Sequence, residues 1–434
     1  MKLLYIWINE SRNIKNRGFN LSGNYYIEYD SVNKVISGYK KNDTIKDFFR
    51  LPTQNEFCKS LEITAIVGAN GTGKTTLLNY ILGACYIYLF DLIIYEDNNI
   101  IKVIINDAEL SDIRLDFNLD NDVILTDTNL HNQDIIYYSS VFDANDSLDY
   151  SFEVLDRRLH NISTNYLLNF SYCFNDGKWP VTQRDCYKSD EIIRQIIFTF
   201  EQWNTYKNYL PFNIPKEIKM SLINTASDNF IHPYFENQEH NFLKPNISDF
   251  TDNFHFHILM RLVDDFREPE QTLNDILLKY LQNKKVSIDQ WVKKALKEMI
   301  DECSRQSFDT NLIDKIESQL IVIEKFESLL SKMKGNVLHS NEISLKVDES
   351  VYEFVKFYDK TISYNPLLKF EWNQLSSGEN SLLSFFSRFY EIVSKNQIEN
   401  ENILILIDEL DTYLHPEWQR NMVYILVSVC NEFF

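Results

Sequence analysis

The spacing of hydrophobic and polar positions changes twice along the chain and divides it into three parts. In residues 1–144, short apolar runs such as 3–8 and 135–138 alternate with polar turns, which predicts strands. Residues 145–341 instead repeat apolar positions at helical spacing. In residues 342–434, strand-like and helix-like runs alternate again. The pattern predicts an α/β protein with a mainly helical insertion.

The insertion is predicted to be compact and not a long arm. Helical spacing covers residues 191–206, 273–281, 291–303 and 312–330. In the last of these segments the 3-4-3 spacing lasts for about two heptads, whereas a coiled coil needs three or four. We therefore expect packed helices in this region.

The insertion contains a basic cluster that is the densest of this region. It consists of Lys284, Lys285, Lys293, Lys294 and Lys297. A solvated helix face, balanced by Asp289 and Glu298, and a surface that contacts DNA are both consistent with this cluster. The net charge of the chain is −20, so the protein as a whole has no bulk attraction to nucleic acid. We favour the solvated face.

Composition narrows the class of protein further. Hydrophobic residues make up 44% of the chain, which is enough for a large core. The six cysteines are scattered without a C-x-x-C pair, so neither a zinc site nor a disulfide framework is supported, and a reducing cytoplasm fits. The sequence has no run of about 18 apolar residues. We expect a cytoplasmic protein that does not engage a membrane.

A glycine-rich loop carries the strongest chemical signal. Residues 68–75 read Gly-Ala-Asn-Gly-Thr-Gly-Lys-Thr and fit the pattern G-x-x-x-x-G-K-[ST]. The whole chain has only 10 glycines, and three of them lie in this loop. The apolar run 63–67 predicts a buried strand before the loop, and the run 77–82 predicts a helix after it. This strand–loop–helix order is the context that the motif requires.

The residue types of the loop suit phosphate binding. Glycines allow successive backbone N–H groups to point at phosphate oxygens, and the helix that begins near Lys74 adds its positive end. We expect Lys74 to reach the β- and γ-phosphates of ATP and Thr75 to ligate Mg²⁺. The predicted nucleotide-binding residues of the loop are Gly68, Asn70, Gly71, Thr72, Gly73, Lys74, Thr75 and Thr76.

Two carboxylates follow the last strand-like run. Residues 403–407 are all apolar, which predicts a strand buried on both faces, and Asp408 and Glu409 come directly after it. Parallel strands place ligands at their C-terminal edge. Neighbouring residues of a strand point to opposite sides, so the two acids can have different roles. We expect Asp408 to hold Mg²⁺ beside Thr75 and Glu409 to polarise the attacking water as general base.

A second helix start has the character of an anion site. Ser376, Ser377 and Gly378 directly precede an apolar helix predicted over residues 382–393. Backbone N–H groups at a helix start are free to bind an anion. By itself the signal is weak, because Ser-Ser-Gly is also a common turn. Its position, upstream of Asp408, strengthens it.

Together these segments resemble the ABC-type ATPase heads of the SMC, RecF and overcoming-lysogenization-defect (OLD) group. In this resemblance residues 68–75 are the Walker A motif, 375–379 the signature and 403–409 the Walker B motif. Residues 410–419 resemble the Leu-His-Pro continuation of OLD-like and phage-defence ATPases. The implied fold class is α/β, a P-loop NTPase ABC-type head with an N-terminal antiparallel β lobe. The resemblance leaves the helical insertion unexplained.

The resemblance implies a mechanism and a partner. Two heads would form an ATP-dependent homodimer around two ATP molecules, with Ser376, Ser377 and Gly378 of one chain on the γ-phosphate held by the other. Hydrolysis would open the dimer and drive a conformational change in an effector protein or on DNA, with phage defence as the setting. The alternative is a non-catalytic switch or scaffold that binds ATP in order to assemble with an effector.

Two weaker candidates follow from the same resemblance. Arg12 comes just after the first predicted strand, where several ATPase families place a basic residue on the nucleotide; a solvated loop arginine is the alternative. Ser139, Ser140 and Asp143 follow the run 135–138, where related ATPases place a residue that senses the attacking water or the metal. A plain exit from the strand into a loop is the alternative there.

The sequence departs from the group after the Walker B motif. The group continues with a helix and then a strand that ends in a histidine on the γ-phosphate, whereas here the helix predicted from Pro416 is the last element. None of the eight histidines lies beyond His415. Either the sequence is a piece of a longer head, which we favour, or the head works without that histidine.

Overall fold

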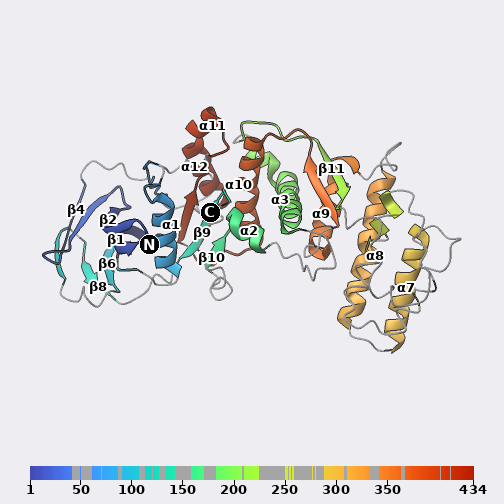
Figure 1. Ribbon diagram of the computed structural model, residues 1–434, viewed down its shortest axis with the longest axis horizontal. Helices are drawn as coiled ribbons and strands as arrows, with labels where there is room; N and C mark the ends of the chain where they lie inside the picture. The colour runs from blue at the N-terminus through green and yellow to red at the C-terminus, as the bar shows by residue number, and fades with distance from the viewer. Residues whose placement is uncertain are drawn as a thin grey trace. The chain divides into compact units, whose positions relative to one another are not determined.

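The computed structural model forms two compact units, which are described separately (Figure 1). Unit 1 consists of Met1–Leu167 and Arg388–Phe434, and unit 2 of Leu168–Ser387. The structure describes residues 1–41, 49, 61–69, 71–86, 90–106, 113–119, 121–126, 133–142, 158–170, 182–207, 210–223, 250–252, 254–255, 257–258, 276, 279, 288–306, 310–332, 342–362, 367–400, 402–410 and 412–434.

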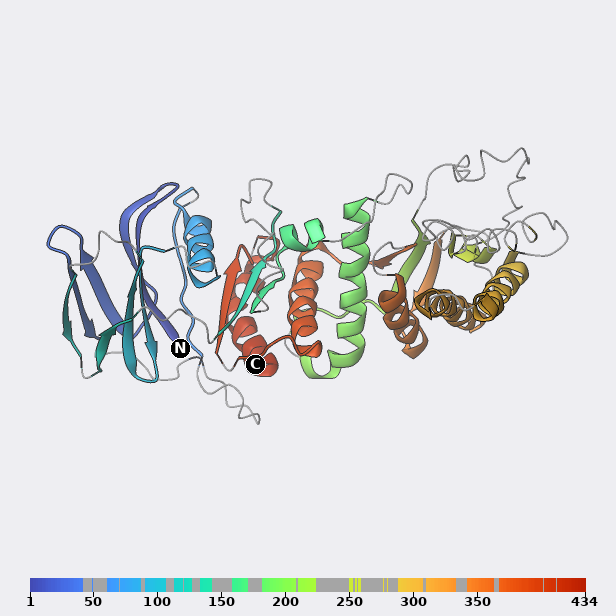
Figure 2. The same ribbon diagram turned by 90° about the horizontal axis from the view of Figure 1, so that it is seen from below.

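Unit 1 begins with two facing sheets, visible edge-on in Figure 2. The first, in the order β2-β1-β5-β6-β8, contains β1 (Lys2–Ser11), β2 (Ile14–Asn20), β5 (Leu92–Asp97), β6 (Ile100–Ile105) and β8 (Val123–Leu125). The second, in the order β3-β4-β7, contains β3 (Tyr25–Asp30), β4 (Val35–Lys40) and β7 (Arg114–Asn118). Pairing is antiparallel except between β6 and β8 and between β4 and β7. The lobe is therefore mainly, but not wholly, antiparallel.

Alternation along β1 explains why the first sheet is covered on both faces. Tyr5 and Trp7 belong to the core shared with the second sheet. Ile6 and Ile8 point the other way, into the core built around α1 (Lys74–Tyr86). This is the two-residue period of a strand. In α1 itself Cys85 is fully buried, and burial raises the pKa of its thiol to about 12, so it remains a neutral core residue.

The other side of α1 packs against a parallel sheet in the order β10-β9-β14. Its strands are β9 (Asp134–Ser139), β10 (Leu159–Asn161) and β14 (Ile403–Asp408). In the register of the sheet, Asp408 lies opposite Ser139, so β9 and β14 end at the same edge. The helices α2 (Thr164–Phe170), α11 (Pro416–Arg420) and α12 (Met422–Phe433) follow these strands, together with the second half of α10 (Ser377–Ser394).

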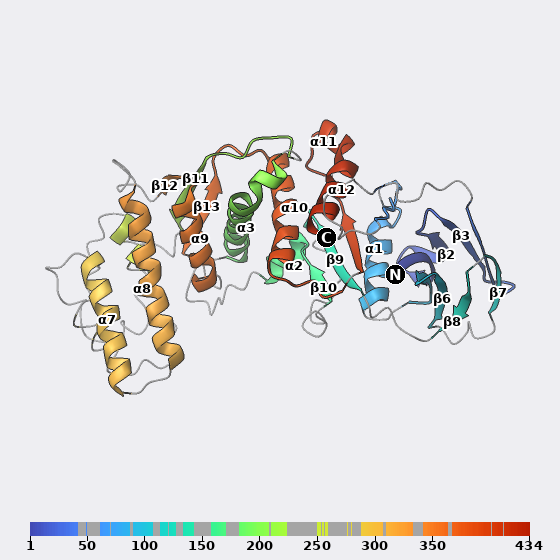
Figure 3. The same ribbon diagram turned by 180° about the vertical axis from the view of Figure 1, so that it is seen from behind.

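Unit 2 combines helices with a small antiparallel sheet in the order β12-β11-β13. The strands are β11 (Glu217–Leu222), β12 (Glu342–Lys346) and β13 (Leu368–Trp372). The helices are α3 (Gln183–Tyr206), α7 (Ile288–Gln306), α8 (Thr310–Ser331), α9 (Glu349–Ile362) and the first half of α10. Figure 3 shows α7 and α8 side by side. Buried aromatic contacts link α8 and α9 to β13 through Phe326, Phe354, Tyr358 and Phe370.

The predicted strand over residues 63–67 is wrong. Residues 61–69 form no strand, and the Val67 side chain is 91% exposed. A strand requires a neighbour for its ladder, and the polar side chains of this segment are instead held by the loop after β2. Ser22 Oγ and the Gly23 N–H donate to the Glu62 carboxylate, and the Thr64 hydroxyl donates to the Leu21 carbonyl.

Other expectations need correction in detail. The single helix predicted from Pro416 is broken at Asn421 into α11 and α12, because Asn421 leaves helical geometry with a ψ of 2°. Residues 342–387 pack with the insertion, since β11 of the insertion pairs with both β12 and β13. Cys186 of α3 is disulfide-bonded, which the scattered cysteines did not predict. Most of the helix expected over 273–281 lies outside the described residues.

Candidate nucleotide-binding site

The glycine-rich loop adopts a tight curl that only glycine tolerates at two positions. Gly71 and Gly73 have φ angles of 79° and 95°, in the left-handed region. At Gly73 a side chain would also lie within about 3 Å of the Asn13 amide. Within the curl, the Thr72 hydroxyl donates to the Ala69 carbonyl at 2.8 Å. The loop is therefore shaped by its own residues and by the turn that carries Asn13.

Lys74 lies at the first turn of α1 with its ammonium group against the loop. Its Nζ donates to the Gly68 carbonyl at 2.9 Å and to the Ala69 carbonyl at 3.1 Å. Both acceptors are neutral, whereas a phosphate oxygen would be a charged and stronger acceptor. The side chain is thus close to the place where the loop would hold a phosphate. Thr76 follows on α1, and Asn70 lies outside the described residues.

One cavity of unit 1, of about 220 Å³, brings three predicted residues together. Thr75 reaches it from the first turn of α1, and Asp408 and Glu409 reach it from the end of β14. Asp408 is buried, and Glu409 is exposed with a φ of 50°, an unusual backbone for a residue other than glycine. The C-terminal edge of the parallel sheet and the start of α1 therefore line the same cavity.

The donor set of this cavity fits a magnesium ion. Thr75 and Asp408 offer a hydroxyl and a carboxylate, the hard oxygen ligands that Mg²⁺ prefers. Among the described residues no three His, Cys, Asp or Glu side chains gather into a metal cluster. Mg²⁺ uses one or two protein ligands and completes its shell with water and substrate phosphates. Asn79, one turn after Thr75, also lines the cavity, and its buried Oδ1 has no hydrogen-bond partner within the part of the chain that the structure describes.

A chain of hydrogen bonds fixes the backbone next to Glu409. Ser140 Oγ donates to the Glu409 carbonyl at 2.6 Å. The Thr164 hydroxyl is 3.1 Å from the carbonyls of Ser139 and Ser140. The buried guanidinium of Arg388 donates to the Thr164 hydroxyl at 3.3 Å and to the Ile162 carbonyl at 2.9 Å. The end of β9, the start of α2 and the second half of α10 thus support the segment that carries Glu409.

The sequence-based interpretation missed several polar residues of this region. Ser163 and Asn165 line the same cavity from the start of α2, and Asn79 lines it from α1. The spacing of four residues between Thr75 and Asn79 places both on one face of a helix, a signal that was available. No local signal marks Ser163 or Asn165, because the parallel pairing of β10 with β9 brings them there. Ser139 of the predicted sensor group also lines the cavity, whereas Asp143 lies outside the described residues.

The turn between β1 and β2 contacts the loop through Asn13. Asn13 Nδ2 donates to the Gly71 carbonyl at 3.2 Å. Arg12, the predicted nucleotide contact, is exposed in the same turn with a φ of 50°. A nucleotide contact by Arg12 stays a prediction.

The signature residues form a reciprocal helix cap in unit 2. The Ser376 N–H donates to the Glu379 carboxylate at 2.8 Å, and the Glu379 N–H donates to Ser376 Oγ at 3.3 Å. Ser376 and Ser377 are exposed, and Gly378 is buried in the first turn of α10. This geometry is that of a helix cap, and γ-phosphate binding by these residues stays a prediction.

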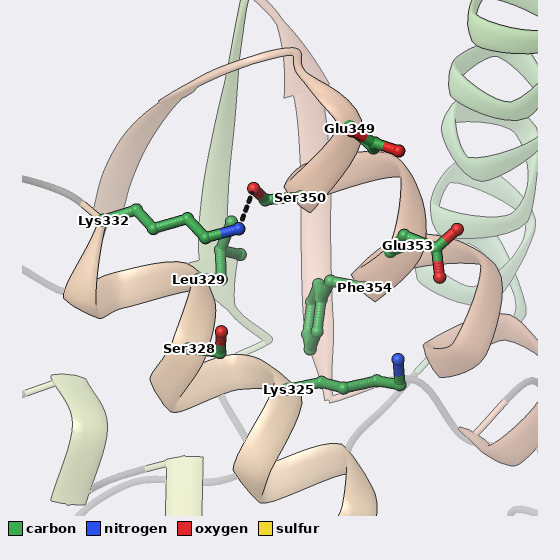
Figure 4. Close-up of a pocket in the computed structure, with 8 residues that line it drawn as sticks. All are labelled: Lys325, Ser328, Leu329, Lys332, Glu349, Ser350, Glu353 and Phe354. Carbon is green, nitrogen blue, oxygen red and sulfur yellow. Dashed lines mark hydrogen bonds between the residues drawn. The ribbon is translucent and has the colours of Figure 1, made fainter.

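A further cavity of about 240 Å³ lies between α8 and α9 in unit 2 (Figure 4). Its lining includes Lys325, Lys332, Glu349 and Glu353, two charges of each sign. Lys332 already donates to Ser350 Oγ at 2.6 Å. The balance of charge favours neither an anion nor a cation, so we assign no ligand there.

Comparison with known proteins gives one result. The AAA ATPase domain family matches residues 44–434, which includes the glycine-rich loop, the signature segment and both carboxylates. Neither the curated proteins nor the solved structures contain a match. Among the described helices, none is both long and apolar enough to cross a bilayer. The match supports a P-loop α/β fold with ATP binding and hydrolysis, and the chain belongs to the AAA ATPase domain family.

Proposed function

We propose that the chain binds Mg·ATP at the cavity of unit 1 and hydrolyses it to ADP and phosphate. The observation that carries the proposal is that Thr75, Asp408 and Glu409 share one cavity beside the glycine-rich loop. Thr75 and Asp408 would hold Mg²⁺, which neutralises the charge that develops on the transferred phosphoryl group. Lys74 would exchange its neutral carbonyl acceptors for the β- and γ-phosphates.

Glu409 is the residue that we propose as the general base. It comes directly after Asp408 and lines the same cavity, so that one acid can bind metal while the other orients the water. The hydrogen bond from Ser140 to the Glu409 carbonyl holds the backbone in place, which favours a fixed carboxylate. A positioned base of this kind typically contributes about 10²–10⁴-fold to a rate.

We extend the proposal to an ATP-dependent homodimer of ABC type. Its support is the resemblance to the SMC, RecF and OLD group, together with a second helix start, at Ser376–Gly378, that has an anion-binding character. These residues of one chain would complete the site of the other chain. Action on an effector protein or on DNA, in phage defence, rests on the resemblance alone.

The test is the variant Glu409→Gln. We expect its affinity for Mg·ATP to equal that of the parent in calorimetric titration, because Lys74, Thr75 and Asp408 are intact. Hydrolysis should fall by about 10²–10⁴-fold because the base is lost.

Glu28→Gln, at an exposed position of β3, is the matched control and should hydrolyse ATP at the parent rate. Parent-like hydrolysis by Glu409→Gln would exclude Glu409 as the base. If the parent itself binds Mg·ATP without turnover, the non-catalytic switch would replace the hydrolase.

A further inference from the structure

The segment that carries the signature residues is held at both of its ends by one buried side chain. Residues 373–376 connect β13 to α10. Trp372 ends the strand before this connection, and Asn380 lies one turn into the helix after it. The amide of Gln195, from the middle of α3, bonds to both. In Figures 1 and 3, α3 lies beside the start of α10.

The geometry of Gln195 uses nearly all of its hydrogen-bonding capacity. Its Oε1 accepts from the Trp372 indole N–H at 2.8 Å. Its Nε2 donates to Asn380 Oδ1 at 3.1 Å and to Ser384 Oγ at 2.9 Å. The side chain is completely buried, so these bonds act without competition from water. A single planar group therefore fixes the distance between the end of β13 and the first two turns of α10.

The connection that Gln195 spans needs such support. Gln374 has a φ of 69°, a left-handed backbone that persists in a residue other than glycine only where the surroundings impose it. Immediately after it, Ser376 and Glu379 form the helix cap. The position of the exposed Ser376 and Ser377 thus depends on how β13 and α10 are held together.

Contacts of α3 with β13 and α9 in turn fix the position of Gln195. Ser189, on the same helix, donates to the Leu368 carbonyl of β13 at 3.0 Å. Towards the other end of α3, Phe200 stacks on Tyr352 of α9 with ring centroids 4.2 Å apart. Lys356 of α9 donates to the Glu201 carboxylate at 2.7 Å. The helix α3 of the insertion is therefore tied to α9 and β13 and, through Gln195, to the start of α10.

We propose that Gln195 is a positioning residue for the signature, through which the helical insertion sets the placement of Ser376 and Ser377 for the partner chain's γ-phosphate. The inference rests on the proposed composite site. Gln195 belongs to unit 2, whereas the glycine-rich loop and the two carboxylates belong to unit 1. Its loss should leave ATP binding by a single chain unchanged and lower hydrolysis about 10- to 100-fold, as a small misplacement of a site does.

The test is complementation in mixed dimers. Gln195→Met keeps the volume of the side chain and removes its hydrogen bonds, and Trp372→Phe removes only the indole donor. Gln183→Met, at an exposed position of the same helix, is the matched control. Each variant is mixed with Lys74→Ala, which lacks the loop lysine, and separately with Ser377→Asp, which places a carboxylate in the signature.

A signature lesion should be rescued by Lys74→Ala, because one of the two composite sites is then free of both lesions. It should not be rescued by Ser377→Asp, because every signature is then damaged. We expect this pattern for Gln195→Met and for Trp372→Phe, with ATP affinity of each variant unchanged. The control Gln183→Met should behave as the parent.

Three outcomes would overturn the inference. They are rescue of the Gln195 and Trp372 variants by both partners, rescue by neither partner, and loss of ATP affinity in these variants. The mixture of Ser377→Asp with Lys74→Ala tests the composite site separately from the role of Gln195. If this mixture fails to recover hydrolysis, the proposed composite site itself is wrong; if it recovers and the Gln195 variants are not rescued, only the role of Gln195 is wrong.

Discussion

The described starts of α1 and α10 are both proposed to bind phosphate, and they differ in which groups satisfy their backbone N–H groups. The start of α1 has no acidic residue in its first turn, and two left-handed glycines curl the loop before it. The start of α10 has Glu379 in its first turn, and the Glu379 carboxylate accepts the Ser376 N–H. Both helices have a positive end, but only one of them carries its own anion.

In the proposed function, this difference separates a primary phosphate site at α1 from a conditional one at α10. At α1, Lys74 and the loop can attract a phosphate without help from a partner. At α10, an incoming phosphate meets the carboxylate of Glu379, so its intrinsic affinity is low. A phosphate already held by another chain avoids this penalty in part, because it is delivered at high local concentration. The comparison thus supports the proposal that the signature acts on a nucleotide bound elsewhere.

The largest expected effect comes from Lys74→Ala. Affinity for ATP should fall by about 100-fold or more, since charged hydrogen bonds contribute about 1.5–3 kcal/mol each. Calorimetric titration measures the affinity for ATP. The control is Lys40→Ala, which replaces an exposed lysine of β4. Unchanged affinity would remove the difference between the two helix starts, since α1 would then not be the primary site.

A smaller effect is expected from Ser377→Asp at the other helix start. The added carboxylate suits a helix N-terminus, so the fold should be retained, and ATP affinity of a single chain should be unchanged. Hydrolysis should fall by about 10- to 100-fold through repulsion of the γ-phosphate. The neutral control is Ser377→Asn. If Ser377→Asp hydrolysed ATP at the parent rate, the signature segment would be only a helix cap without a role in hydrolysis.

The smallest effect is expected from Glu379→Ala, which opens the cap of α10. The free energy of unfolding should fall by about 1 kcal/mol because the reciprocal cap is lost. The rate of hydrolysis should not fall, because the substitution removes only the acceptor of the Ser376 N–H, and this N–H then becomes free to bind a phosphate. Urea unfolding measures the free energy of unfolding, with Glu379→Gln as a control variant that keeps a hydrogen-bond acceptor. Loss of hydrolysis at retained stability would assign Glu379 a role beyond capping.

Local patterns predicted the parts of the molecule in which neighbouring residues decide the structure. The loop over residues 68–75 and the start of α1 at Lys74 follow from residue types within one short segment. The strand that ends at Asp408 follows from a continuous apolar run. The family match supports the ATPase class that these motifs indicated. The roles of the individual residues stay predictions.

Long-range pairing decides what the local patterns missed. Residues 63–67 have the composition of a strand, but Glu62 and Thr64 are bonded to the loop after β2. Asn165 reaches the cavity only because β10 pairs with β9, and Gln195 reaches the residues on either side of the signature only because α3 packs against β13. Such contacts join residues that are far apart in the sequence, so no periodicity reveals them.

The most direct measurement for the central claim is a crystal structure of Glu409→Gln with Mg·ATP. The account predicts the γ-phosphate against Lys74, Mg²⁺ ligated by Thr75 and Asp408, and a water molecule beside residue 409. It also predicts Ser377 of a second copy of the chain at the same γ-phosphate. Nucleotide bound away from the glycine-rich loop, or Mg²⁺ without Asp408 in its shell, would contradict the account.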